Sequence, residues 1–103
     1  MVMGPSCGLV LADLGAEVIK IEPTPSGDNT RRLTGSGAGY WPTYNRNKKS
    51  LAIDMKSAEG RRQFEALVKS ADCVVNNLRG TQPAKLGIDY ANLKHLKPSI
   101  VCL

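Results

Sequence analysis

Cationic and amide side chains follow the predicted strands of this sequence at the points where the strands end. Arg31 comes after the first strand, Lys56 after the second, and Asn77, Arg79 and then Lys85 after the third. Ligands of open α/β sheets bind outside the carboxyl ends of the strands. Guanidinium and ammonium groups favour anions there. Any one charged loop residue is usually only a solvated surface group. Several strand ends with such residues together predict an anion site, but they do not identify the anion.

Three carboxylates lie near these positions, at Glu22, Asp28 and Asp54. None has a second carboxylate, a histidine or a serine at a spacing that favours general acid–base or nucleophilic chemistry. The lone His95 has no cysteine, histidine or carboxylate at metal-ligand spacing. We therefore assign no catalytic residue and expect no metal site.

A glycine-rich stretch, Gly35 to Gly39, invites comparison with phosphate-binding loops. No strand runs directly into it, no Lys-Ser or Lys-Thr pair closes it, and Tyr40 stands where a dinucleotide fingerprint needs its third glycine. We interpret this stretch as a flexible loop or lid. A nicotinamide-binding module is correspondingly disfavoured.

The elements that must position these groups alternate between helix and strand. Pro5 and Gly15 bracket a helix on which Val10, Leu11 and Leu14 share one face. The expected elements that follow are a strand at 17–22, a turn-rich loop at 23–39, a short helix within 40–49 and a strand at 51–55.

The second half continues the alternation. Ser57 is placed to cap a helix whose inward stripe comprises Phe64, Leu67, Val68 and Ala71. The expected elements that follow are a strand at 73–77, a helix capped by Asp89 with Leu93 and Leu96 inward, and a strand at 99–103. Alternating strands and helices predict parallel pairing through right-handed crossovers, hence an α/β fold. We expect one partial domain over residues 1–103, truncated at both ends.

Composition narrows the choice of partner. Lysine and arginine outnumber aspartate and glutamate by 14 to 9, giving a net charge of +5. This excess favours anionic partners. The basic residues are spread along the chain and the aromatics are few, so we expect no nucleic acid and favour a phosphorylated small molecule.

Cysteine usage and hydropathy indicate the compartment. The three cysteines, Cys7, Cys73 and Cys102, show no CxxC spacing and sit among apolar neighbours. They are typical of buried, reduced thiols in a reducing compartment. No apolar run is long enough to cross a membrane. We expect a cytoplasmic protein with no membrane partner.

Long stretches of the sequence resemble the class III CoA-transferase (CaiB/BaiF) family, which includes formyl-CoA transferases and α-methylacyl-CoA racemases. The most specific are LADLGAEVIKIEP at 11–23 and NRNKKSLAIDMK at 45–56. The shorter matches are GPSC at 4–7, Gly27-Asp28 with Arg31, ADCVVNN at 71–77, LGIDY at 86–90 and PSIV at 98–101.

The resemblance implies a Rossmann-like fold, a mainly parallel sheet with flanking helices, that binds coenzyme A as substrate and needs no prosthetic group. It implies transfer of CoA from an acyl-CoA to a carboxylic acid acceptor through an aspartyl intermediate, in an interlocked homodimer. It places the CoA contacts at Arg31, Ile53, Asp54, Met55, Lys56, Asn77, Leu78, Arg79 and Lys85.

Two departures from the family pattern bear on specificity. Val2 stands where some transferases carry a glutamine, which argues against formyl-CoA transferase specificity, and Lys85 stands where some members carry arginine. The family's nucleophilic aspartate and the racemase His and Asp lie beyond the matched stretches. A racemase-type epimerase and a catalytically inactive CoA-binding remnant therefore remain alternatives, and the acyl donor and acceptor are not determined.

Overall fold

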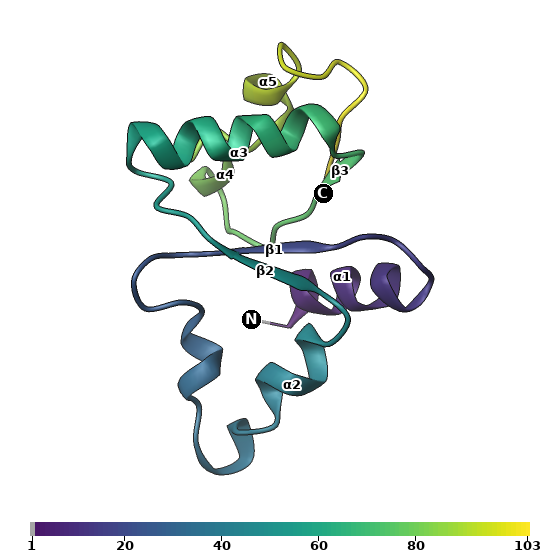
Figure 1. Ribbon diagram of the computed structural model, residues 1–103, viewed down its shortest axis with the longest axis vertical. Helices are drawn as coiled ribbons and strands as arrows, with labels where there is room; N and C mark the ends of the chain where they lie inside the picture. Colours follow the sequence, from purple (N-terminus) through teal and green to yellow (C-terminus); the bar gives the residue numbers. More distant parts are fainter. Residues whose placement is uncertain (1) are drawn as a thin grey trace. The chain divides into compact units, whose positions relative to one another are not determined.

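The chain folds into two compact units, Met1–Ile53 and Asp54–Leu103, in a computed structural model that describes residues 2–103. Figure 1 shows the helices and strands of both units. Each unit contains one pair of parallel strands. The predicted α/β class and parallel pairing are confirmed.

The first unit surrounds the parallel pair of β1 (Ile19–Glu22) and β2 (Lys49–Ala52). The pairing register aligns Ile19 with Lys49 and Glu22 with Ala52, so both strands end at the same edge. The other elements of this unit are α1 (Met3–Asp13), the 3-10 turns η1 (Asn29–Arg32) and η2 (Gly35–Gly37), and α2 (Tyr40–Asn45).

Helix α1 ends as the sequence predicts but buries a different face. Gly15 adopts a left-handed φ of 99° directly after the helix, a conformation that glycine adopts without strain. The predicted apolar face is exposed, and Gly8 and Leu9 are buried instead. A Cβ at Gly8 would lie 3.2 Å from Lys48 Cε, so the missing side chain allows this close approach.

The second unit is built around α3 (Ala58–Ser70), an amphipathic helix. Phe64 and Val68 are buried on it, together with Leu93 and Ile100 from later in the chain. Of the stripe predicted on α3, Phe64 and Val68 are buried, whereas Leu67 and Ala71 are half-buried. The remaining elements are β3 (Cys73–Val74), α4 (Gln82–Lys85), α5 (Tyr90–Leu93) and β4 (Val101–Cys102).

Several predicted boundaries are wrong. Strand β2 begins at Lys49 and ends at Ala52, so the strand predicted at 51–55 lay too late, because a turn follows at Asp54. Strands β3 and β4 are shorter than predicted, and neither α4 nor the two 3-10 turns were predicted. The cysteines are half-buried rather than fully buried. Along the described residues, no helix has the length and apolar character needed to cross a membrane.

The start of α3 gives a test of the fold. The Ser57 hydroxyl accepts a hydrogen bond of 3.0 Å from the Gly60 N–H and donates one of 2.9 Å to the Asp54 carbonyl. Ser57→Ala should lower the free energy of unfolding by about 1 kcal/mol, and Ser57→Asp should retain most of it, because aspartate also caps. Ser70→Ala, in the last turn of the same helix, is the control for urea denaturation. Equal stability of the Ser57→Ala and Ser70→Ala proteins would contradict the capping role.

Candidate functional site

The nine residues predicted to contact CoA fall in both units. Arg31 and Ile53 belong to the first unit, and the second contains Asp54, Met55, Lys56, Asn77, Leu78, Arg79 and Lys85. The cationic members are all exposed, whereas the Ile53 side chain is 2% exposed. The Ile53 N–H donates to the Glu22 carbonyl at 2.9 Å, so this residue extends the β1–β2 pairing.

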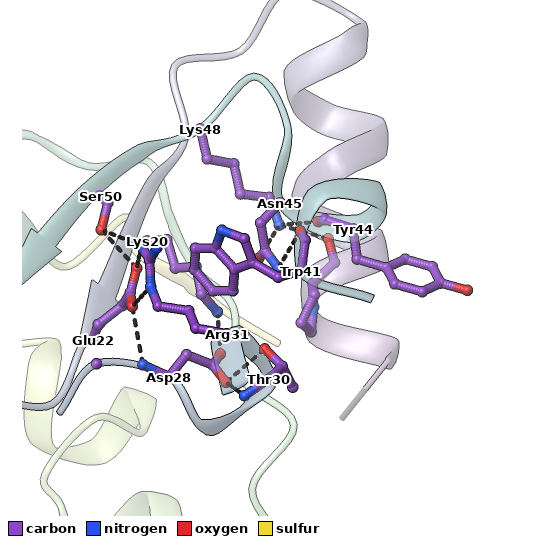
Figure 2. A network of polar contacts seen from close by, with 12 residues as sticks. Lys20, Glu22, Asp28, Thr30, Arg31, Trp41, Tyr44, Asn45, Lys48 and Ser50 are labelled. Carbon is purple, nitrogen blue, oxygen red and sulfur yellow. Dashed lines mark hydrogen bonds and ion pairs between the residues drawn. The ribbon is translucent and has the colours of Figure 1, made fainter. Parts of the chain in front are cut away.

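In the first unit, Arg31 forms a two-armed ion pair with Glu22, shown in Figure 2. Its Nε donates to Glu22 Oε2 and its Nη2 to Oε1, each at 2.8 Å. The Glu22 side chain is 3% exposed, and that of Arg31 is 39% exposed. Two parallel charge-assisted bonds hold a guanidinium in one plane with one carboxylate. Arg31 therefore has its Nε–Nη2 edge against a buried anion, while its side chain remains partly exposed.

Glu22 is fully engaged by its neighbours. Ser50, on β2, donates to Oε1 at 2.6 Å, and the Asp28 N–H donates to Oε2 at 3.0 Å. Four hydrogen bonds thus satisfy the carboxylate, two of them from Arg31. A carboxylate bound in this way is not available as a nucleophile or base. The arrangement holds a cation.

The loop between β1 and η1 approaches this pair closely because it contains Gly27. Gly27 has a φ of +67°, and a Cβ there would lie 3.1 Å from Glu22 Oε2 and 3.4 Å from Arg31 Cδ. A side chain would meet both strain and crowding at this position. The glycine therefore permits the close turn that delivers the Asp28 N–H to Glu22.

A second ion pair lies beside the first. Lys20 Nζ is 2.8 Å from Asp28 Oδ2, and Asp28 Oδ1 accepts from both the N–H and the hydroxyl of Thr30, at 2.8 and 2.7 Å. The Trp41 ring, from α2, carries the Arg31 guanidinium 3.6 Å from its centroid and Lys20 Nζ at 5.3 Å. Both cations are within cation–π range of one indole.

Lys48 fixes the helix that carries Trp41. Its ammonium donates to the carbonyls of Pro5 and Tyr44, at 2.7 and 2.8 Å, joining α1 to the end of α2. Burial lowers the pKa of Lys48, and the positive charge of Lys20 adds to the effect. Arg46 and Asn47 both donate to Asp13, at 2.7 and 2.8 Å, and secure the same junction.

The hydrogen bonds set the protonation of both carboxylates. The Arg31 hydrogen bonds, with help from Ser50 and the Asp28 N–H, outweigh burial and lower the pKa of Glu22 from 4.5 to about 2. Burial alone would raise the pKa of Asp28, but hydrogen bonds from Lys20 and Thr30 prevail and lower it from 3.8 to about 2. Both groups are anions at neutral pH.

In the second unit, the residues after β2 form a tight turn. Asp54 Oδ1 accepts a hydrogen bond from the Lys56 N–H at 3.0 Å. The Lys56 side chain is exposed just before α3. Asp54, which was expected within the strand at 51–55, lies in this turn instead and is exposed.

The segment that carries Lys85 is held by Arg61 on α3. Its Nη1 and Nη2 donate to the carbonyls of Leu86 and Gly87, at 2.8 and 2.9 Å, and its Nε to Glu65 at 2.9 Å. Among the described residues, none forms an ion pair with Lys56, Arg79 or Lys85. All three side chains are exposed.

Sequence reasoning missed several members of the first-unit cluster. It singled out Arg31 but not its supports Trp41, Ser50 and Lys20, and it gave Glu22 no partner. The alternation of Lys20 and Glu22 on one strand was a usable signal, because both side chains leave the same face. Trp41 lies in a stretch without a periodic pattern, so only the structure shows where its ring lies.

Comparison with known proteins gives a consistent result. The sequence model of CoA-transferase family III matches residues 1–103. An acyl-CoA transferase of Fusarium pseudograminearum is 39% identical over 95% of this chain and 24% of that protein. A succinate–glutarate CoA-transferase of Agrobacterium fabrum is 37% identical over 95% of this chain and 27% of that protein.

A solved structure agrees with these relatives. The crystal structure of a CAIB/BAIF family protein from Brucella suis superposes with a TM-score of 0.86 and 38% identity, over 98% of this chain and 29% of that one. The chain thus spans about a quarter of the length of the relatives it matches.

The lowered pKa of Glu22 predicts how stability depends on pH. A carboxylate with a lowered pKa in the folded state stabilises the fold above its unfolded pKa and loses that contribution as pH falls through the folded value. The contribution of Glu22, on the order of 3 kcal/mol, should be complete above pH 4.5 and decline toward pH 2. Glu22→Gln should be less stable at neutral pH and lose less stability over that range. Acid unfolding followed by circular dichroism, with Glu17→Gln as control, checks this, and parallel curves for Glu22→Gln and wild type would contradict it.

Proposed function

This chain belongs to CoA-transferase family III, and we propose that it is the CoA-binding amino-terminal portion of an enzyme that moves CoA between carboxylic acids. The observation that carries the proposal is the family match over the whole chain. It is supported by a solvent-facing arginine held on a buried carboxylate in the first unit. The relatives named above are transferases of acyl-CoA or of CoA.

The proposed ligand suits the groups that the chain offers. CoA carries a 3′-phosphate and a pyrophosphate, and exposed guanidinium and ammonium groups bind phosphates through charge-assisted hydrogen bonds. Arg31 is the proposed phosphate contact of the first unit, and Ile53 contributes only through its backbone, since its side chain is buried. The proposed contacts of the second unit are Asp54, Met55, Lys56, Asn77, Leu78, Arg79 and Lys85.

The proposed reaction is a double displacement. An aspartate carboxylate attacks the thioester carbonyl, and the C–S bond of the tetrahedral adduct breaks, which releases CoA as a thiolate and leaves a mixed anhydride on the aspartate. The thiolate then returns to form an aspartyl-CoA thioester as the first carboxylate departs, and the acceptor acid takes the CoA by the reverse steps. We place this aspartate outside residues 1–103, because the resemblance to the family places it beyond the matched stretches.

The remaining expectations follow from family membership. We propose that the acyl-CoA and the carboxylic acid acceptor meet in an interlocked homodimer in the cytoplasm. CoA acts as substrate in this scheme, and no prosthetic group is required. In this scheme the chain holds the CoA phosphates so that the thioester reaches the aspartate. It thus contributes to catalysis by orienting the substrate rather than by acid–base chemistry.

Arg31→Ala in the full gene product should weaken CoA binding by about tenfold or more, because a charge-assisted hydrogen bond to phosphate is lost. The matched control is Arg32→Ala, since Arg32 is the next residue and, among residues 2–103, donates only to Asn29 and to the Ser26 carbonyl. Calorimetric titration checks the affinity, and thermal unfolding confirms that both variants are folded. Equal affinity of wild type and Arg31→Ala would contradict the phosphate role. Titration with dephospho-CoA shows whether the 3′-phosphate is the group bound.

A further inference from the structure

The orientation of Arg31 is determined by other residues of the first unit. Glu22 accepts from Nε and Nη2 of the guanidinium, and Ser50 Oγ lies 3.4 Å from Nη2. The guanidinium carbon lies over the Trp41 ring, 3.6 Å from the ring centroid. These contacts, from residues drawn in Figure 2, restrict the movement of the guanidinium.

The remaining edge of the guanidinium is the one that carries Nη1. No residue among 2–103 accepts a hydrogen bond from Nη1. The Arg31 side chain is also more than a third exposed. An arginine that binds phosphate through its Nε–Nη2 fork would have to leave Glu22. Doing so would strand a carboxylate that is 3% exposed, which is strongly unfavourable.

We propose that Glu22 and Trp41 are positioning residues for Arg31, and that Arg31 receives a CoA phosphate oxygen on its Nη1 edge while its fork stays on Glu22. This inference rests on the proposed function and deepens it. It assigns a role to two residues that do not themselves touch the ligand. It also predicts that the ion pair between Arg31 and Glu22 persists in the complex.

Two physical effects of Glu22 oppose each other, and this makes the proposal testable. Its negative charge disfavours a nearby phosphate. Its hydrogen bonds hold Arg31 in one conformation, so less rotational freedom is lost when the ligand binds. If Glu22 acted only as a charge, removing it would tighten CoA binding. If it positions Arg31, removing it weakens binding.

Glu22→Gln is the direct test. Glutamine keeps the shape of the side chain, but its amide NH₂ replaces one of the two acceptor oxygens, so one arm of the fork is lost. The matched control is Glu17→Gln, which makes the same chemical change at a residue just before β1. Glu17 forms an ion pair with the exposed Lys49 on β2. We expect Glu22→Gln to weaken CoA binding by about tenfold in calorimetric titration of the full gene product. Glu17→Gln should bind as wild type or slightly more tightly.

Substitutions of Trp41 test the same proposal without uncovering a buried charge. Trp41→Phe keeps an aromatic face for Arg31, and Trp41→Leu removes it. We expect Trp41→Phe to retain most of the CoA affinity and Trp41→Leu to lose about fivefold, with both proteins folded by circular dichroism. A merely structural role for the side chain would not rank the aromatic substitute above the aliphatic one at equal stability.

The outcomes separate this inference from the proposed function. A wild-type protein that binds no CoA overturns both. CoA binding that Arg31→Ala leaves unchanged removes Arg31 from the site and overturns the inference with it. CoA binding that is weakened by Arg31→Ala but unchanged or tightened by Glu22→Gln overturns the positioning role alone. Equal affinities of Trp41→Phe and Trp41→Leu overturn the part assigned to Trp41.

Discussion

The buried carboxylate of Glu22 is the constraint around which the first unit is organised. A buried anion is stable only when its oxygens are paired and hydrogen-bonded. The donors come from two separate stretches of chain, namely the turn after β1, with the Asp28 N–H and Arg31, and β2, with Ser50. Satisfying this one group therefore fixes the loop after β1, the register of β2 and the guanidinium of Arg31.

The same constraint links structure to the proposed function. Arginine is flexible, and an exposed arginine alone would bind phosphate only after losing that freedom. Here the ion pair and the Trp41 ring hold the guanidinium of a side chain that remains partly exposed. In the second unit, Arg61 holds the Leu86 and Gly87 carbonyls next to Lys85. The first unit thus contains an exposed arginine held by an ion pair, and the second contains an exposed lysine beside a segment that Arg61 holds. The chain that contains both belongs to CoA-transferase family III.

Sequence predicted the elements better than the contacts between them. The cap at Ser57, the glycine after α1 and the core positions Phe64 and Val68 follow from local chemistry and helical periodicity, and all three are confirmed. The end of β2 was misplaced because the apolar residues Ile53 and Met55 continue the strand pattern beyond Ala52, where β2 ends before the turn at Asp54. The support of Arg31 was missed because Glu22, Trp41 and Ser50 are far apart in sequence. Only the packing of α2 and the pairing of β1 with β2 bring them together.

The most direct test of this account is a crystal structure of the full gene product with CoA bound. The account predicts a CoA phosphate oxygen at about 3 Å from Arg31 Nη1, with Nε and Nη2 still donating to Glu22. A complex in which Arg31 has left Glu22 to grip the phosphate with its fork would contradict the positioning role. A complex in which no phosphate reaches Arg31 would contradict the site itself.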